Sequence, residues 1–86
     1  MEYEYILYIK EQCPWCVRAV NALNSREKHF KKISLDQNLK ILEDLKEAYG
    51  WKTVPMVFQK TGHDNYTLLG GYTDLYEHLE VSDGQE

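Results

Sequence analysis

Two kinds of spacing separate the hydrophobic residues in the first half of the chain. Residues 3–9 are aromatic or β-branched and almost continuously apolar, which predicts a strand covered on both faces of a sheet. From residue 14 to residue 24 the apolar side chains recur every three or four positions, which predicts a helix. Residues 30–35 alternate only in part, so they predict a second strand less clearly.

A second helix is predicted after residue 35. Either Asp36 or Asn38 can cap its N-terminus, since both residue types accept hydrogen bonds from the first backbone N–H groups of a helix. Gly50 is placed just past its C-terminus, where glycine is favoured. The apolar stripe of this helix consists of Leu42, Leu45, Ala48 and Tyr49.

The last third of the chain predicts a hairpin followed by a helix. Residues 54–58 form a strand that begins at a proline, residues 61–65 form a turn, and residues 66–69 form the returning strand. Two glycines then break the chain, and residues 82–86 are expected to form a frayed tail. The apolar face of the last helix consists of Tyr72, Leu75, Tyr76 and Leu79.

Composition narrows the class of protein. The chain has 86 residues, 43% of them hydrophobic and 28% charged, which suits one small globular domain over residues 1–86. A net charge of −4 argues against nucleic acid or an anionic membrane as the main partner. No apolar run is long enough to span a bilayer. The first residues lack the basic and apolar segments of a secretory signal, so we expect a cytoplasmic protein.

The chemistry is concentrated in Cys13-Pro14-Trp15-Cys16, which holds the only two cysteines. The segment lies between the first strand and the first helix, with Cys13 at the expected N-cap and Pro14 at the first helical position. Unpaired N–H groups and the helix dipole stabilise an anion there, so the Cys13 pKa should fall below its ordinary value of about 8.5. Cys16 lies one turn later, within reach of a disulfide formed at Cys13. This is the arrangement of a redox dithiol.

The predicted order of elements is β-α-β-α-β-β-α. A parallel βαβ unit followed by an antiparallel hairpin and a helix gives a four-stranded mixed sheet. Together with the C-x-x-C pair, this order predicts the α/β thioredoxin-like fold at its minimal size.

The sequence resembles the glutaredoxin family in three motifs. Cys13-Pro14-Trp15-Cys16 resembles the family's Cys-Pro-Tyr-Cys, with Trp in place of Tyr. Residues 53–55 resemble its Thr-Val-Pro, and residues 70–75 resemble its Gly-Gly-x-x-Asp-Leu. Lys10 stands where many glutaredoxins keep a lysine before the dithiol.

The resemblance implies a site for glutathione. It implies that the Val54–Pro55 bond is cis and faces Cys13, which leaves the backbone of Val54 free to pair with a bound thiol peptide. Glycines at 70–71 let a ligand approach the backbone closely. The next helix start and Thr73 can donate to the γ-glutamyl carboxylate, and Asp74 can accept from its ammonium group. The residues expected to bind glutathione are Lys10, Trp15, Thr53, Val54, Pro55, Gly71, Tyr72, Thr73 and Asp74.

The residues also leave bland interpretations open. Pro55 can simply begin a strand, and residues 70–74 can be a turn and a helix cap. Lys52 is a second candidate for the glycine carboxylate of glutathione, although a solvated lysine is the simpler interpretation. Trp15 is expected to be an exposed stacking surface, whereas Trp51 is expected to pack.

Three alternatives concern the cofactor or the electron donor. Zinc is disfavoured because a structural site needs four ligands, and His29, His63 and His78 are dispersed and expected on the surface. A glutathione-ligated iron–sulfur cluster is a family property mainly of members with other active-site sequences. Some glutaredoxin-like proteins take electrons from thioredoxin reductase without binding glutathione.

The expected function is therefore that of a glutathione-dependent thiol–disulfide oxidoreductase that reduces protein disulfides and glutathione mixed disulfides. Cys13 attacks the substrate sulfur and Cys16 resolves the mixed disulfide. We expect a monomer with no metal. Ribonucleotide reductase is a common protein substrate in the family, but no residue of this sequence points to it.

Overall fold

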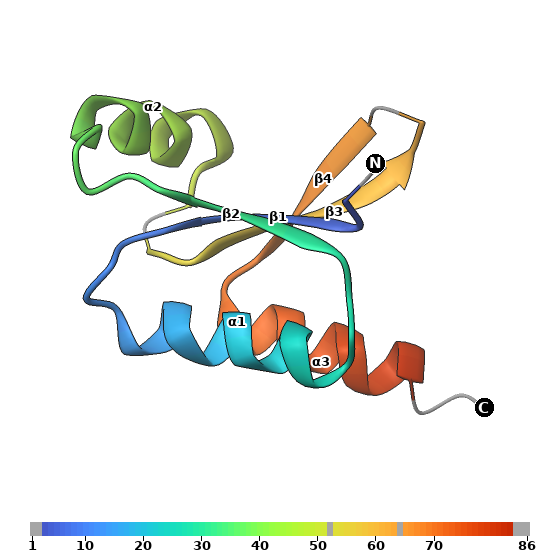
Figure 1. Ribbon diagram of the computed structural model, residues 1–86. Helices are drawn as coiled ribbons and strands as arrows, with labels where there is room; N and C mark the ends of the chain where they lie inside the picture. The colour runs from blue at the N-terminus through green and yellow to red at the C-terminus, as the bar shows by residue number, and fades with distance from the viewer. Residues whose placement is uncertain (1–2, 52, 64, 84–86) are drawn as a thin grey trace.

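The computed structural model describes residues 3–51, 53–63 and 65–83, and within these ranges the chain forms four strands and three helices (Figure 1). The order is β-α-β-α-β-β-α, which confirms the predicted fold class. The elements are β1 (Tyr5–Ile9), α1 (Pro14–Ser25), β2 (Phe30–Ser34), α2 (Leu39–Tyr49), β3 (Met56–Gly62), β4 (Asn65–Gly70) and α3 (Tyr72–Asp83).

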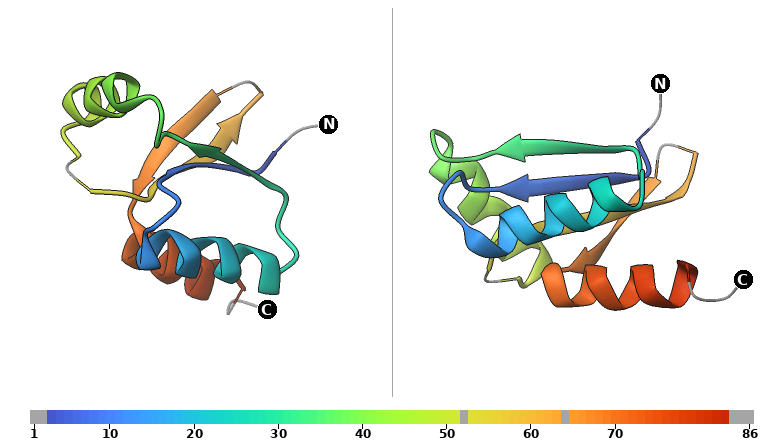
Figure 2. Two further views of the ribbon diagram at one scale, coloured as in Figure 1. Left: turned by 60° about the vertical axis from the view of Figure 1, so that its left-hand side comes forward. Right: turned by 60° about the horizontal axis from the view of Figure 1, so that its bottom comes forward.

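The strands form one mixed sheet in the order β2-β1-β3-β4. β1 is parallel to β2, with Leu7 opposite Lys32, and antiparallel to β3, with Leu7 opposite Val57. β3 and β4 are antiparallel. Helices α1 and α3 lie side by side on one face of the sheet, and α2 lies on the other face near one end (Figures 1 and 2). The parallel pair therefore places the N-terminus of α1 at the end of β1.

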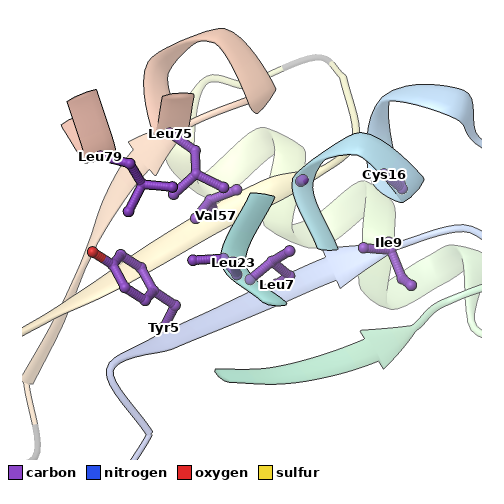
Figure 3. Close-up of a cluster of buried hydrophobic side chains, with 9 residues drawn as sticks. Tyr5, Leu7, Ile9, Cys16, Leu23, Val57, Leu75 and Leu79 are labelled. Atoms are coloured by element: carbon purple, nitrogen blue, oxygen red, sulfur yellow. The ribbon is translucent and has the colours of Figure 1, made fainter. Parts of the chain in front are cut away.

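The core lies between the sheet and the α1–α3 layer. Leu7 and Val57 project from the sheet towards Leu23 of α1 and towards Leu75 and Leu79 of α3 (Figure 3), and all five are completely buried. Burying each such side chain contributes roughly 1.5–3 kcal/mol. This layer fixes the N-terminal ends of α1 and α3 next to each other.

The strand boundaries differ from the predicted ones at several ends. The first strand starts at Tyr5, where its pairing with β2 and β3 begins, and Tyr3 before it is exposed. The second ends at Ser34, and Leu35 follows it as a buried residue whose N–H donates to Ile9. The third begins at Met56 and runs to Gly62, longer than the predicted 54–58. The predicted turn is correspondingly shorter, and its Asp64 lies outside the described residues.

The second helix begins after Asn38 and ends at Gly50, whose left-handed φ of 63° suits glycine. Asn38 is the N-cap residue but makes no side-chain cap hydrogen bond. The predicted apolar stripe is only partly correct. Leu42 is buried, whereas Ala48 and Tyr49 are exposed, because α2 covers only one end of its face of the sheet (Figure 1).

The last helix is longer than predicted. α3 continues to Asp83, so the prediction of a frayed tail is wrong for residues 82–83, and residues 84–86 lie outside the described part. Leu75 and Leu79 form its buried face as predicted, but Tyr76 is 40% exposed and faces away from the core. Over the residues that the structure describes, no helix combines the length and the apolar character needed to cross a membrane.

Candidate active site

The dithiol lies at the start of α1, as predicted. Cys13 is the N-cap residue with extended backbone angles, and Pro14 is the first residue of the helix. Cys13 and Cys16 are joined by a disulfide, and the backbone N–H of Cys16 donates to the Cys13 sulfur at 3.2 Å. Cys13 is half-buried, whereas Cys16 is only 1% exposed. Cys13 is thus the sulfur that a substrate can reach, and Cys16 is the sulfur behind it.

A carboxylate holds the loop that leads to the dithiol. Asp36 accepts hydrogen bonds from the backbone N–H of Glu11 at 2.8 Å and from the Ser34 hydroxyl at 2.7 Å. The Ser34 hydroxyl, followed by the Glu11 N–H, lowers the pKa of Asp36 below its ordinary value of 3.8. The predicted helix-capping role of Asp36 is wrong, because this carboxylate ties the start of the next segment to the residues before Cys13.

The loop before β3 faces the dithiol. The Val54–Pro55 bond is cis, which confirms the expectation drawn from the resemblance. The carbonyl oxygen of Val54 lies 3.8 Å from the sulfur of Cys13. Pro55 is buried and Val54 is half-buried. This loop is therefore packed against the protein beside the Cys13 sulfur.

The start of α3 forms a third segment of the site. The backbone N–H of Gly71 donates to the Asp74 carboxylate at 3.1 Å, and the Leu75 N–H donates to the Gly71 carbonyl at 3.0 Å. Asp74 therefore supplies the reciprocal hydrogen bond of a capping box. Gly70 has a φ of 132°, and the Asp74 carboxylate occupies the space where a Cβ would lie. Only glycine fits at position 70 with this cap in place.

The three segments enclose a cavity of about 250 Å³ beside Cys13. Eight of the nine predicted binding residues line it. The lining residues are Trp15, Trp51, Thr53, Val54, Pro55, Gly71, Tyr72, Thr73 and Asp74.

Two tryptophans contribute to this cavity in different ways. Trp15 is 51% exposed, as predicted, and its ring lies 5.7 Å from the ring of Tyr72. Trp51 packs at the back of the cavity, 3.6 Å from the position that a Cβ on Gly71 would take. Its buried indole N–H has no hydrogen-bond partner among the described residues. The sequence interpretation assigned Trp51 no role in binding, although its position two residues before the Thr53 motif was an available signal.

Lys10 is the one predicted binding residue that the structure does not bring into this cavity. It lines a separate cavity of about 170 Å³ with Cys16, Val17 and Lys32. Lys52, the second candidate cation, lies outside the described residues.

The histidines are arranged largely as expected. His29 and His63 are exposed, but His78 is half-buried, so its predicted surface position is wrong. His78 is hydrogen-bonded to the amide of Gln59 at 3.1 Å and meets the ring of Tyr5 edge-on. In the ranges that the structure describes, no three His, Cys, Asp or Glu side chains are grouped closely enough to hold a metal ion.

A mixed four-stranded sheet with a helix-capping dithiol opposite a cis-proline loop defines the class of thiol–disulfide oxidoreductases with a thioredoxin-like fold. Comparison with known proteins identifies the family within this class. The glutaredoxin family profile matches residues 5–63. Glutaredoxin 3 of Escherichia coli K12 is 36% identical over 70 residues, which are 81% of this chain and 78% of that protein.

Solved structures agree with this assignment. Wheat glutaredoxin has a TM-score of 0.76 at 30% identity, with 91% of this chain and 71% of that chain covered. The buckwheat glutaredoxin–glutathione complex has a TM-score of 0.75 at 25% identity, with 96% and 72% covered. The chain belongs to the glutaredoxin family, whose activity is thiol–disulfide exchange.

Proposed function

We propose that this protein is a glutathione-dependent oxidoreductase that uses the Cys13–Cys16 dithiol to reduce protein disulfides and glutathione mixed disulfides. The observation that carries the proposal is the cavity beside Cys13, which brings the residues 53–55 loop and the start of α3 together around one reactive sulfur. A tripeptide thiol needs a surface of this kind, with backbone groups along its length and charge-binding groups at one end.

The cavity offers complementary groups for the cysteine and γ-glutamyl parts of glutathione. The backbone of Val54 can pair with the cysteine residue of the ligand, since the Val54 N–H has no partner among the described residues. The N-terminus of α3 and the Thr73 hydroxyl can donate to the γ-glutamyl carboxylate. Asp74 can accept from the ammonium group. We retain Lys10 as a predicted contact for the glycine carboxylate.

The reaction proceeds through two exchanges of sulfur partners. The Cys13 thiolate attacks one sulfur of a substrate disulfide, and the other sulfur leaves as a thiolate that takes up a proton. With a protein disulfide, Cys16 then attacks Cys13, which releases the reduced substrate and leaves the Cys13–Cys16 disulfide. With a glutathionylated protein, Cys13 keeps the glutathione, and a second glutathione removes it as oxidised glutathione.

A coupled assay tests the choice of electron donor. The complete chain is supplied with a small disulfide substrate and NADPH, together with either glutathione and glutathione reductase or thioredoxin reductase alone. We expect NADPH consumption only in the first mixture. Turnover with thioredoxin reductase and none with glutathione would replace this proposal with a glutathione-independent function. The binding of glutathione to the buckwheat relative supports the first outcome.

A further inference from the structure

A second groove begins next to the active site and runs between α1 and α3. It has a volume of about 340 Å³, and Arg18, Ala22 and Arg26 of α1 line it together with Tyr72 and Tyr76 of α3. Tyr72 also lines the cavity beside Cys13, so the two hollows are adjacent and share this side chain. The two helices that line this groove lie side by side on one face of the sheet (Figure 2).

Aromatic and arginine side chains contact one another at the end of the groove near the dithiol. The guanidinium of Arg18 lies 4.6 Å from the centre of the Trp15 ring. The Trp15 ring lies 5.7 Å from Tyr72, and Tyr72 lies 5.9 Å from Tyr76. Residues three or four apart on a helix share a face, and this spacing separates Trp15 from Arg18 and Tyr72 from Tyr76. These tilted ring contacts therefore extend from the active site along both helices.

At the far end of the groove, the positive charge of Arg26 is paired within the protein. Arg26 lies over the ring of Tyr76 at 5.6 Å and forms an ion pair with Glu80 at 3.7 Å. A hydrogen bond with Glu80, together with its negative charge, raises the pKa of Tyr76 above 10.0. The positive charge at this end is thus already matched by a carboxylate.

Arg18 presents a different situation. It is exposed, and it forms no ion pair with a carboxylate in the described part of the chain. A guanidinium in contact with an aromatic ring still has N–H donors that can bind a carboxylate. The contact with Trp15 also restricts the rotamers of Arg18 before any ligand binds, which lowers the conformational entropy lost on binding.

We propose that this groove binds the polypeptide carrying the target disulfide and that Arg18 selects an acidic side chain close to the target cysteine. Arg18 is five helical residues from Cys13, an axial rise of about 7.5 Å, and its guanidinium reaches the dithiol end of α1 through its contact with Trp15. An extended peptide covers that distance in about two to three residues. The acidic residue is therefore placed two or three positions from the sulfur that Cys13 attacks. The inference rests on thiol exchange at Cys13 and is independent of the use of glutathione.

The test uses peptides that contain one internal disulfide and carry Glu, Gln or Lys two or three positions outside it, on either side. Each peptide is mixed with the reduced full chain in the absence of glutathione. Two electrons and two protons pass from the dithiol to the peptide, which leaves the Cys13–Cys16 disulfide. Acid quenching and mass spectrometry follow the loss of two hydrogens from the protein. We expect the Glu peptide to react about fivefold faster than the Gln peptide, and the Lys peptide more slowly than either. High salt should shrink these differences.

Variants of Arg18 assign the selectivity to the groove. R18Q should remove the preference for Glu, and R18E should reverse it in favour of Lys. K40E is the matched control, because it changes the charge equally at an exposed lysine at the start of α2, on the opposite face of the sheet (Figure 1). It should keep the preference of the unmodified protein. All rates are divided by the rate with a small uncharged disulfide, which corrects for changed reactivity of Cys13.

Two results would overturn the inference. One is equal rates for the three peptides with the unmodified protein, a measurement that needs no variant to fold. The other is an equal loss of selectivity in R18E and K40E, which would assign it to the net charge of the molecule. Because no glutathione is present, either result leaves the electron-donor assay unaffected.

Discussion

The two sulfurs of the site occupy different surroundings although they are only three residues apart. Cys13 caps the helix and is half-buried, whereas Cys16 is enclosed by the core. An incoming disulfide can therefore reach Cys13 first, and Cys16 acts afterwards by attacking the Cys13 sulfur of the mixed disulfide, which releases the substrate thiol. Cys13 occupies the N-cap position, and a helix start of this kind favours an anion.

This asymmetry predicts different effects for the two serine substitutions. C13S should abolish turnover of every disulfide substrate. C16S should keep the removal of glutathione from a glutathionylated protein but lose reduction of internal protein disulfides. The measurement is turnover with one substrate of each kind, at equal protein concentration. Activity that survives in C13S would show that the roles are reversed.

Asp74 combines a structural contact with a proposed binding role, and two substitutions separate them. D74N keeps an oxygen that can accept from the Gly71 N–H but removes the charge. We expect its KM for glutathione to rise about five- to tenfold with little change in stability. D74A also removes the cap, so it should additionally lose about 1 kcal/mol of unfolding free energy. If D74N has an unchanged KM, the carboxylate acts only on the helix.

Among the connections between elements, the hydrogen bonds of Asp36 tie the segment after β2 to the loop before α1. Since the pKa of Asp36 is lowered in the folded protein, its ionised form favours folding. This contribution is complete above the ordinary value of about 3.8 and is lost as the pH falls through the lower folded value.

D36N tests this connection. The substitution keeps the size of the side chain and removes its charge, so the variant should be less stable than the original protein at pH 6. The difference in thermal midpoint should shrink as the pH falls below about 4, because protonation of Asp36 removes the charge that D36N lacks. Hydrogen exchange at the Glu11 amide should be faster in the variant at pH 6. A difference in thermal midpoint that does not depend on pH would contradict the assignment to ionisation.

The element order could be predicted because each segment has its own period or turn residues, but exposure along α2 could not. The spacing of apolar residues identifies a helix but does not show how much of that helix contacts the sheet. Tyr49 belongs to the apolar stripe and contacts Phe58 at 5.1 Å, yet it is half-exposed because α2 overhangs one end of the sheet. The extra length of α3 was not predicted, because residues 82 and 83 are polar and come after the apolar residues that identified the helix.

The molecule as a whole is held by the layer between the sheet and the two helices α1 and α3. Leu79 is completely buried in it, and Val81, two residues later, is 59% exposed. L79A should reduce the free energy of unfolding by about 2–5 kcal/mol, whereas V81A should change it by less than about 0.5 kcal/mol. Urea unfolding of both variants measures the difference. Equal losses would mean that the end of α3 is not packed as described.

The sequence predicted more of the residues that line the candidate site than of the residues around it. Its three motifs are local in the sequence, and a family resemblance places them together. Trp51 has only its position near residue 53 as a signal and Asp36 has none, because their contacts with Gly71 and Glu11 depend on how distant segments meet. Trp51 borders the cavity only because Gly71 approaches it. Lys10 illustrates the opposite case, since it is adjacent to the dithiol in sequence but lines a different hollow.

The wide separation of these motifs along the chain has a consequence for the protein during its synthesis. Cys13 and Cys16 leave the ribosome well before residues 53–55, and the glycines that open α3 follow last. A nascent chain can carry both thiols before the segments that line the binding site, and that select between substrates, have been synthesised. Discrimination between substrates is therefore acquired late, when the final helix docks against the first.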